Sequence, residues 1–210
     1  MLTGFRAPLA VAGLALLASG ALSAQAAPAP PSSASSGAAA RSGPTLGFAL
    51  DLNFEFGGDD FLEVFFTSGD SQKIKAGQGG TIAVGGILRP NASSPLSLRG
   101  TLGFKFVTTA ADNANIMFTR IPLEVVGGYD FPNGMRVGAG LVYHVNNEFN
   151  GDGFVPDASF DPAAGFTAEV GYKSVALTYT ALDYAIDGGP SFNGGSIGFQ
   201  FLWTPKRKQR

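Results

Sequence analysis

Residues 45–56 read TLGFALDLNFEF, and from Leu46 onward every second residue is Leu or Phe. Successive side chains of a β-strand point to opposite faces, so one face of this segment carries only large apolar residues. The other face carries Gly, Ala, Asp, Asn and Glu. An amphipathic helix would instead repeat its apolar residues about every three or four positions. The segment therefore predicts a β-strand with one apolar face and one small or polar face.

The same alternation recurs along the rest of the chain and gives eight strands in total. The further segments span about residues 81–89, 97–106, 120–129, 136–145, 166–172, 175–184 and 196–203. Their connections alternate between short turns, at 90–95, 131–134 and 173–174, and long loops, at 57–80, 108–116, 146–163 and 186–195. Short turns at one rim and long loops at the other are typical of outer-membrane barrels. The sequence thus predicts an all-β fold, an eight-stranded antiparallel up-and-down transmembrane β-barrel.

The first long loop has an alternating pattern of its own. Segments 62–67 and 72–75 flank Ser68-Gly69-Asp70, which predicts a hairpin standing above the membrane. The alternative is a ten-stranded barrel in which both segments span the membrane. It is disfavoured because it would crowd five charged residues into a short stretch of the wall: Asp59, Asp60, Glu63, Lys73 and Lys75.

Composition agrees with a barrel and excludes other classes. Only 14% of residues are charged, against about 25% in an ordinary soluble domain. No stretch after residue 26 approaches the roughly 18 consecutive apolar residues of a membrane helix. The net charge of −2 gives no nucleic-acid footprint. Without cysteine the chain has no disulfide and no acylation site for a lipoprotein.

The N-terminal segment has the features of an export signal. Arg6 precedes an apolar run from residue 8 to 22, and Ala24-Gln25-Ala26 forms a small-x-small cleavage site. We therefore expect a signal peptide at 1–26 and a flexible Pro/Ala/Ser leader at 27–44. The barrel domain is expected at 45–204 and a basic tail at 205–210.

The two faces of the strands suit lipid outside and a narrow barrel inside. The apolar face is nearly unbroken Leu, Phe, Val and Ile, whereas a soluble barrel of the lipocalin type turns a charged face to water. Aromatic residues gather at both ends of the strands, as interfacial girdles do. The loop-end group is Phe54, Phe56, Phe104, Phe106, Tyr143 and Phe166, and the turn-end group is Tyr129, Phe131, Tyr172 and Trp203.

Charges on the small and polar face balance five against five. The acids are Asp51, Glu55, Glu124, Glu169 and Asp183, and the bases are Arg89, Arg99, Lys105, Arg120 and Arg136. An unpaired charge in a closed lumen is costly, so we expect a paired structural network that plugs the barrel. Its proposed members are Asp51, Glu55, Arg99, Lys105, Arg120, Glu124, Arg136 and Glu169. Glu124 is expected to pair with Arg99 or Lys105 on the adjacent strand.

The stretch from Thr45 to Trp203 resembles the small outer-membrane barrels of the OmpA and OmpX type in its strand pattern and loop asymmetry. The export signal that precedes it is a further point of resemblance. The resemblance implies a cell outer-membrane location, contact with outer-membrane lipid and lipopolysaccharide, and insertion by the barrel-assembly machinery. One departure concerns that insertion. Proteins of this type usually end on an aromatic residue, whereas here Trp203 is followed by residues 204–210, so the insertion signal is expected to be internal.

His144 is the only histidine and the one candidate base for a catalytic site. Small barrels that deacylate lipid A place a serine two residues after such a histidine, and this chain has Asn146 there. The nucleophile is missing, so His144 is interpreted as a rim residue hydrogen-bonded to its neighbours. No catalytic residue, metal site or cofactor is predicted, and the acids Asp152, Asp157 and Asp161 are interpreted as turn residues.

Three functions of different class remain after this search. A non-enzymatic structural or surface-interaction barrel is favoured, with an extracellular partner that the sequence does not identify. The first alternative is a pore for small solutes or ions. The second is a lipid A-modifying barrel enzyme that would use His144.

Overall fold

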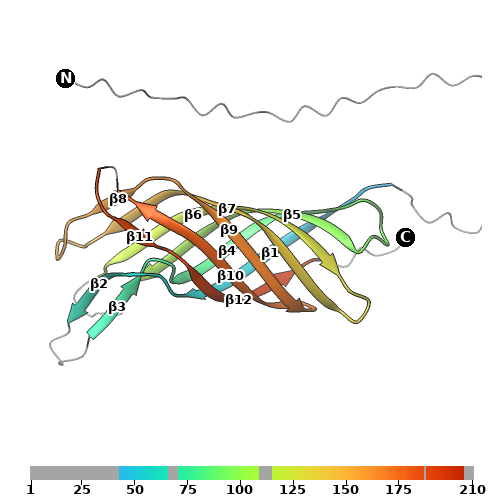
Figure 1. Ribbon diagram of the computed structural model, residues 1–210, viewed down its shortest axis with the longest axis horizontal. Coiled ribbons are helices and arrows are strands. Elements are labelled where there is room, and N and C mark those ends of the chain that lie inside the picture. The colour runs from blue at the N-terminus through green and yellow to red at the C-terminus, as the bar shows by residue number, and fades with distance from the viewer. Residues whose placement is uncertain (1–42, 66–70, 109–114, 187, 206–210) are drawn as a thin grey trace, which may run out of the picture. The chain divides into compact units, whose positions relative to one another are not determined.

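The computed structural model describes residues 43–65, 71–108, 115–186 and 188–205 of the 210-residue chain. The expected signal peptide, nearly all of the expected leader and the tail after residue 205 lie outside the described residues. So does the turn 66–70 of the expected loop hairpin. The description that follows concerns the barrel domain alone (Figure 1).

Eight strands form a closed antiparallel ring, which confirms the predicted fold class. They are β1 (Thr45–Phe56), β4 (Gly79–Arg89), β5 (Leu96–Thr108), β6 (Met117–Asp130), β7 (Met135–Asn150), β9 (Ala163–Tyr172), β10 (Val175–Ala185) and β12 (Ser196–Trp203). Each strand pairs with the next in this order, and β1 pairs with β12 from Leu50↔Trp203 to Phe56↔Ile197. Closure leaves no unpaired sheet edge along the ring, as a membrane-spanning sheet requires.

Four short strands lie outside this ring. β2 (Asp60–Phe65) and β3 (Ser71–Lys75) form a separate two-stranded sheet, which is the hairpin expected in the first loop. Within the described part of the chain these two strands pair with each other alone, so the ten-stranded alternative is wrong. β8 (Ala158–Phe160) extends the sheet beside β7, and β11 (Ser191–Asn193) does so beside β10 (Figure 1).

The third long loop is shorter than the sequence predicted. The loop was expected to begin at Asn146, but β7 continues to Asn150 and pairs there with Met117 of β6. The register shifts between Thr119 and Ile121, and Asn146 on the facing strand has a φ of 52°. A bulge of this kind absorbs one residue and lets pairing resume, and asparagine tolerates the left-handed conformation better than most residues.

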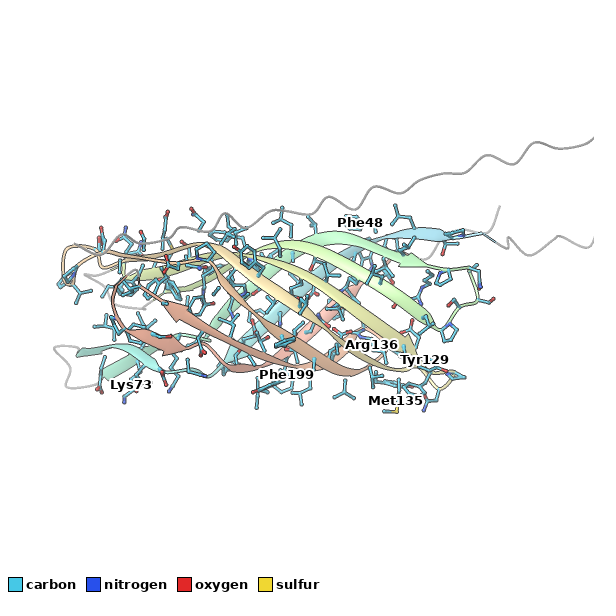
Figure 2. All side chains as sticks on the ribbon, turned by 45° about the horizontal axis from the view of Figure 1, so that its top comes forward. Phe48, Lys73, Tyr129, Met135, Arg136 and Phe199 are labelled. Atoms are coloured by element: carbon cyan, nitrogen blue, oxygen red, sulfur yellow. The ribbon has the colours of Figure 1, made fainter. Side chains whose placement is uncertain are left out.

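The outer wall is apolar over most of its height. Large side chains on the outward positions are exposed, for example Leu102 at 53%, Val125 at 51% and Leu141 at 60%. Phe48 and Phe199 project away from the wall in Figure 2. The aromatic residues predicted for the two girdles are all exposed as well, but Tyr143 lies in the middle of β7 and not at its loop end, because that strand continues to Asn150. No helix among the described residues is both long enough and apolar enough to cross a membrane.

Candidate functional site

The barrel interior is the candidate site, because the strands turn their charged side chains into it. All eight charged residues of the expected network lie on the inward face of the ring. Six of them are at most 8% exposed, namely Asp51, Glu55, Arg99, Lys105, Arg120 and Arg136. Buried charges are tolerated only when they are paired or hydrogen-bonded, so the contacts of each decide what the interior can do.

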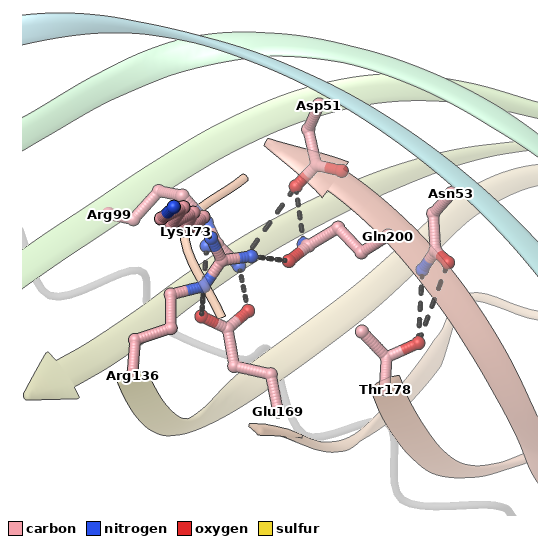
Figure 3. A network of polar contacts seen from close by, with 8 residues as sticks. All are labelled: Asp51, Asn53, Arg99, Arg136, Glu169, Lys173, Thr178 and Gln200. Atoms are coloured by element: carbon pink, nitrogen blue, oxygen red, sulfur yellow. Dashed lines mark hydrogen bonds and ion pairs between the residues drawn. The ribbon is translucent and has the colours of Figure 1, made fainter. Parts of the chain in front are cut away.

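One network lies toward the turn end of the barrel and is centred on Glu169 (Figure 3). Arg99 donates to both of its carboxylate oxygens, at 2.7 and 3.2 Å, and Arg136 Nε lies 3.4 Å from Oε1. Arg136 also donates to the Gln200 Oε1 atom at 2.8 Å, and Gln200 Nε2 donates to Asp51 Oδ2 at 2.6 Å. Two guanidinium groups therefore hold one carboxylate in place, and Gln200 extends the chain of bonds to Asp51.

A second network, centred on Glu55, lies nearer the loop end. Lys105 Nζ is 2.6 Å from its Oε2 atom. The hydroxyls of Thr180 and Ser196 donate to Oε1 at 2.9 and 2.8 Å. Both carboxylate oxygens therefore accept hydrogen bonds without water.

A piece of the first loop closes the barrel mouth above these networks. We call residues 76–78 the stopper segment. Arg120 donates to the carbonyls of Ala76 and Gln78, each at 2.7 Å, and Lys105 donates to the carbonyl of Gly77 at 2.8 Å. Two buried cations thus hold three consecutive carbonyls of the loop. A methyl group at Gly77 would lie 2.6 Å from the Gly194 carbonyl oxygen, so the chain passes there without room for a side chain.

An apolar cluster surrounds the stopper segment and fills the loop end of the barrel. Arg120 lies over the Phe118 ring at 4.1 Å from its centroid, which is cation–π geometry. The buried members of the cluster are Ile74, Ala76, Val107, Ile116, Phe118, Val142, Phe149, Ala163, Leu182 and Tyr184. The interior is therefore polar toward the turn end and apolar toward the loop end.

Two expectations about the charges need correction, those for Glu124 and for Asp183. Glu124 pairs with neither Arg99 nor Lys105, because those cations are bound to Glu169 and Glu55. Glu124 makes no hydrogen bond or ion pair with any described residue. Asp183 is exposed rather than inward. Arg89 is bound to Asp130 at 2.6 Å at the turn rim, apart from the central networks.

His144 lies inside the barrel and not on its rim. The side chain is 2% exposed, and its Nδ1 atom is 2.5 Å from the Tyr184 hydroxyl. Asn146, which occupies the position of the serine in lipid A deacylases, is exposed. The strand alternation sends the two residues in different directions, because the bulge at Asn146 interrupts it.

The acids of the third loop organise its backbone. Asp157 Oδ1 accepts a hydrogen bond from the Gly151 amide at 2.8 Å, and Asp152 Oδ2 accepts one from the Asn115 amide at 2.7 Å. The bond of Asp157 is the local contact of a turn residue, whereas the bond of Asp152 links the third long loop to the second. Within the described ranges no group of three or more acidic or histidine side chains is placed to hold a metal ion.

Several functional residues were not predicted from the sequence. Gln200 bridges Asp51 to Arg136, and Asn53 bonds Thr178 at 3.4 Å across the interior. Each lies at an inward position of a predicted strand, so the alternation alone could have nominated them. The stopper segment had no comparable signal, because it lies in a loop.

A closed eight-stranded antiparallel barrel with an apolar wall and a polar, filled interior is the architecture of the small outer-membrane barrels. Among solved structures the chain is similar to Neisserial surface protein A. The identity is 14% and the TM-score 0.41, and the match covers 76% of this chain and 98% of that one. No protein-family model matches the chain, and no curated protein matches it.

Proposed function

We propose that this chain is a non-enzymatic outer-membrane protein whose closed barrel holds its long loops at the cell surface, in a structural or surface-interaction role. The observation that carries the proposal is the contrast between wall and interior. The wall presents large apolar side chains around the whole ring, while the interior is filled by bonded charges and by the stopper segment.

The wall supports a lipid environment. Soluble monomers rarely expose apolar patches larger than a few hundred Å². Here all eight strands of the ring carry exposed large apolar residues. Export by the signal peptide 1–26, insertion by the barrel-assembly machinery, and contact with lipid and lipopolysaccharide belong to the same proposal.

The filled interior favours a closed barrel over a pore. An eight-stranded barrel has room for side chains but little else, and here these side chains are bonded to one another. The buried environment of His144, with a tyrosine hydroxyl as its hydrogen-bond partner, offers lipid no reacting group from the outside.

The experiment combines localisation with conductance. The full chain is expressed in a Gram-negative host, the membranes are fractionated, and the purified protein is examined for heat-modifiable migration and in planar bilayers. We expect outer-membrane recovery, a folded band that shifts on boiling, and no conductance steps. Recovery in the soluble periplasm would exclude the proposal, and reproducible conductance would favour the pore.

A further inference from the structure

A small interior cavity lies between the two charge networks. It has a volume of about 10 Å³ and is lined by Asp51, Asn53, Thr81, Ala83, Thr101, Pro122 and Glu124. That volume corresponds to one water-sized sphere. Oxygen atoms from four neighbouring strands of the ring therefore face a space that holds a single small particle.

Two of the atoms around this cavity lack a partner. Asp51 Oδ1 and Thr81 Oγ1 are buried and make no hydrogen bond, while the residues themselves are 5% and 9% exposed. Burying an oxygen of this kind without a partner costs on the order of 1–3 kcal/mol. Glu124, on the same cavity, has no partner among the described residues either. The cavity thus collects oxygen atoms, two of which make no hydrogen bond, and no cation of the described residues is bound to Glu124 there.

The cations of the interior contact other groups than Glu124. Four carboxylates lie in the two networks and the cavity, those of Asp51, Glu55, Glu124 and Glu169. Three cations, those of Arg99, Lys105 and Arg136, form ion pairs with the first, second and fourth of these carboxylates. The fourth cation of the interior, Arg120, is held by the carbonyls of the stopper segment. The four cations therefore balance the four carboxylates in number, but none of them is bound directly to Glu124.

From these observations we infer that the cavity is a binding site for one small monovalent cation, with Na⁺ as the probe. Carboxylate and hydroxyl oxygens are the ligands that a hard cation takes when it leaves its hydration shell. Glu124 supplies the charge, and Asp51 and Thr81 supply the unpartnered oxygens. Arg99 and Lys105 lie within electrostatic reach of Glu124, but their own bonds to Glu169 and Glu55 neutralise them.

The test measures how the folding equilibrium depends on the concentration of Na⁺. The purified full-length protein is unfolded and refolded by urea in detergent at constant ionic strength, with NaCl exchanged for N-methylglucamine chloride, whose cation is too large for the cavity. A cation that binds only to the folded barrel raises the equilibrium constant for folding. Once the cation concentration is well above Kd, this constant rises in proportion to the concentration. We expect up to a tenfold gain in the folding constant for each tenfold rise in Na⁺.

Variants assign that response to the cavity. Glu124→Gln removes the charge and is expected to abolish the dependence on Na⁺. Thr81→Val removes one oxygen at equal size and is expected to shift the dependence to higher Na⁺. Glu148→Gln, an exposed carboxylate on β7, is the matched control and is expected to respond like the wild type.

The same measurements can overturn the proposal. If the wild type folds equally well in both salts, the cavity holds water or Glu124 is protonated, and no cation site exists. If Glu124→Gln and Thr81→Val retain the full response, Na⁺ acts elsewhere. Should Glu124→Gln fail to refold, Thr81→Val still decides between these outcomes.

Discussion

At the scale of single residues, Arg99 contributes most to the turn-end network. It donates to both oxygens of Glu169 and lies 4.0 Å from Asp51 Oδ2, with its side chain 6% exposed. Removing one partner of a buried ion pair leaves the other charge unpaired, whereas replacing both by apolar residues is often tolerated. The two kinds of change therefore have different consequences.

We predict that Arg99→Met lowers the free energy of unfolding by about 3–5 kcal/mol. Asp51 would lose the guanidinium of Arg99, and Glu169 would keep only that of Arg136, whose Nε lies 3.4 Å away. The double variant Arg99→Met with Glu169→Met should recover part of that loss. Urea unfolding in detergent measures both. A single variant as stable as the wild type would show that the network contributes nothing to folding.

A glycine below the second network gives another prediction. A methyl group at Gly198 would lie 2.7 Å from three side-chain atoms, those of Asn53 Oδ1, Glu55 Cγ and Thr178 Oγ1. All three would have to move, so Gly198→Ala should destabilise by about 1–3 kcal/mol, as overpacking does.

Gly47→Ala is the control for this substitution. Gly47 also lies in a strand of the ring, but the nearest atom to its added methyl group is 3.8 Å away. The methyl group therefore finds ordinary contact distances there. Equal losses of unfolding free energy in both variants would mean that the loss comes from strand conformation and not from crowding of the interior.

At the scale of elements, the β2–β3 hairpin is held partly by charge. Asp60 on β2 accepts hydrogen bonds from Lys73 and Lys75 on β3 at 2.8 and 2.7 Å. These bonds lower the pKa of Asp60 below its ordinary value of 3.8. A carboxyl whose pKa is lowered by folding stabilises the folded form above its unfolded pKa. That stabilisation disappears as the pH falls through the lowered value.

We therefore predict that the hairpin amides stay protected at neutral pH and lose protection below about pH 4. Hydrogen exchange of β2 and β3 as a function of pH measures this. The effect should be small, because exposed ion pairs contribute little. Asp60→Asn should remove the pH dependence, and an unchanged profile in that variant would assign it to another group.

The elements predicted from the sequence agree best with the structure, because apolar residues alternate with small or polar residues along the strands. This alternation located every strand of the ring because lipid-side and lumen-side positions differ in residue type over most of the wall. It failed where the interior becomes apolar. In β10 the inward positions include Leu182 and Tyr184, so Asp183 was taken for the inward residue although it points outward. An apolar residue inside the barrel looks the same in sequence as one that faces lipid.

The partners of the charges were less predictable than their positions. A strand pattern gives the face on which Glu124 lies, but not which cation reaches it across the lumen. Arg99 belongs to β5 and pairs with Glu169 of β9, a strand that is not its neighbour in the ring. Contacts across a narrow lumen depend on shear and tilt of the strands, which local sequence does not encode.

At the scale of the whole molecule, the apolar wall predicts that a charged substitution lowers the stability more at the middle of the membrane than near its surface. Val125 lies midway along β6 on the outer face and is 51% exposed, while Phe131 lies at the turn rim and is 41% exposed. A charge on the lipid face of a barrel costs about 2–4 kcal/mol at the midplane and about 0–1 near the interface.

Val125→Arg should therefore destabilise the barrel in lipid vesicles by about 2–4 kcal/mol. Phe131→Arg should have a much smaller effect. Unfolding in guanidinium chloride from phospholipid vesicles measures the difference. Equal effects of the two substitutions would argue that the wall does not face a bilayer.

The way in which the mouth is closed has a consequence for how the surface of this protein can change. Lys105 and Arg120 donate hydrogen bonds to the main-chain carbonyl oxygens of residues 76–78, and every residue type has such an oxygen. Within residues 76–78 the side chains are constrained at Gly77, which has no room for a methyl group, and at Ala76, which is fully buried in the apolar cluster. Exposed side chains of the hairpin before this segment, unlike the buried Ile74, can therefore vary in sequence while these main-chain bonds keep the mouth of the barrel shut.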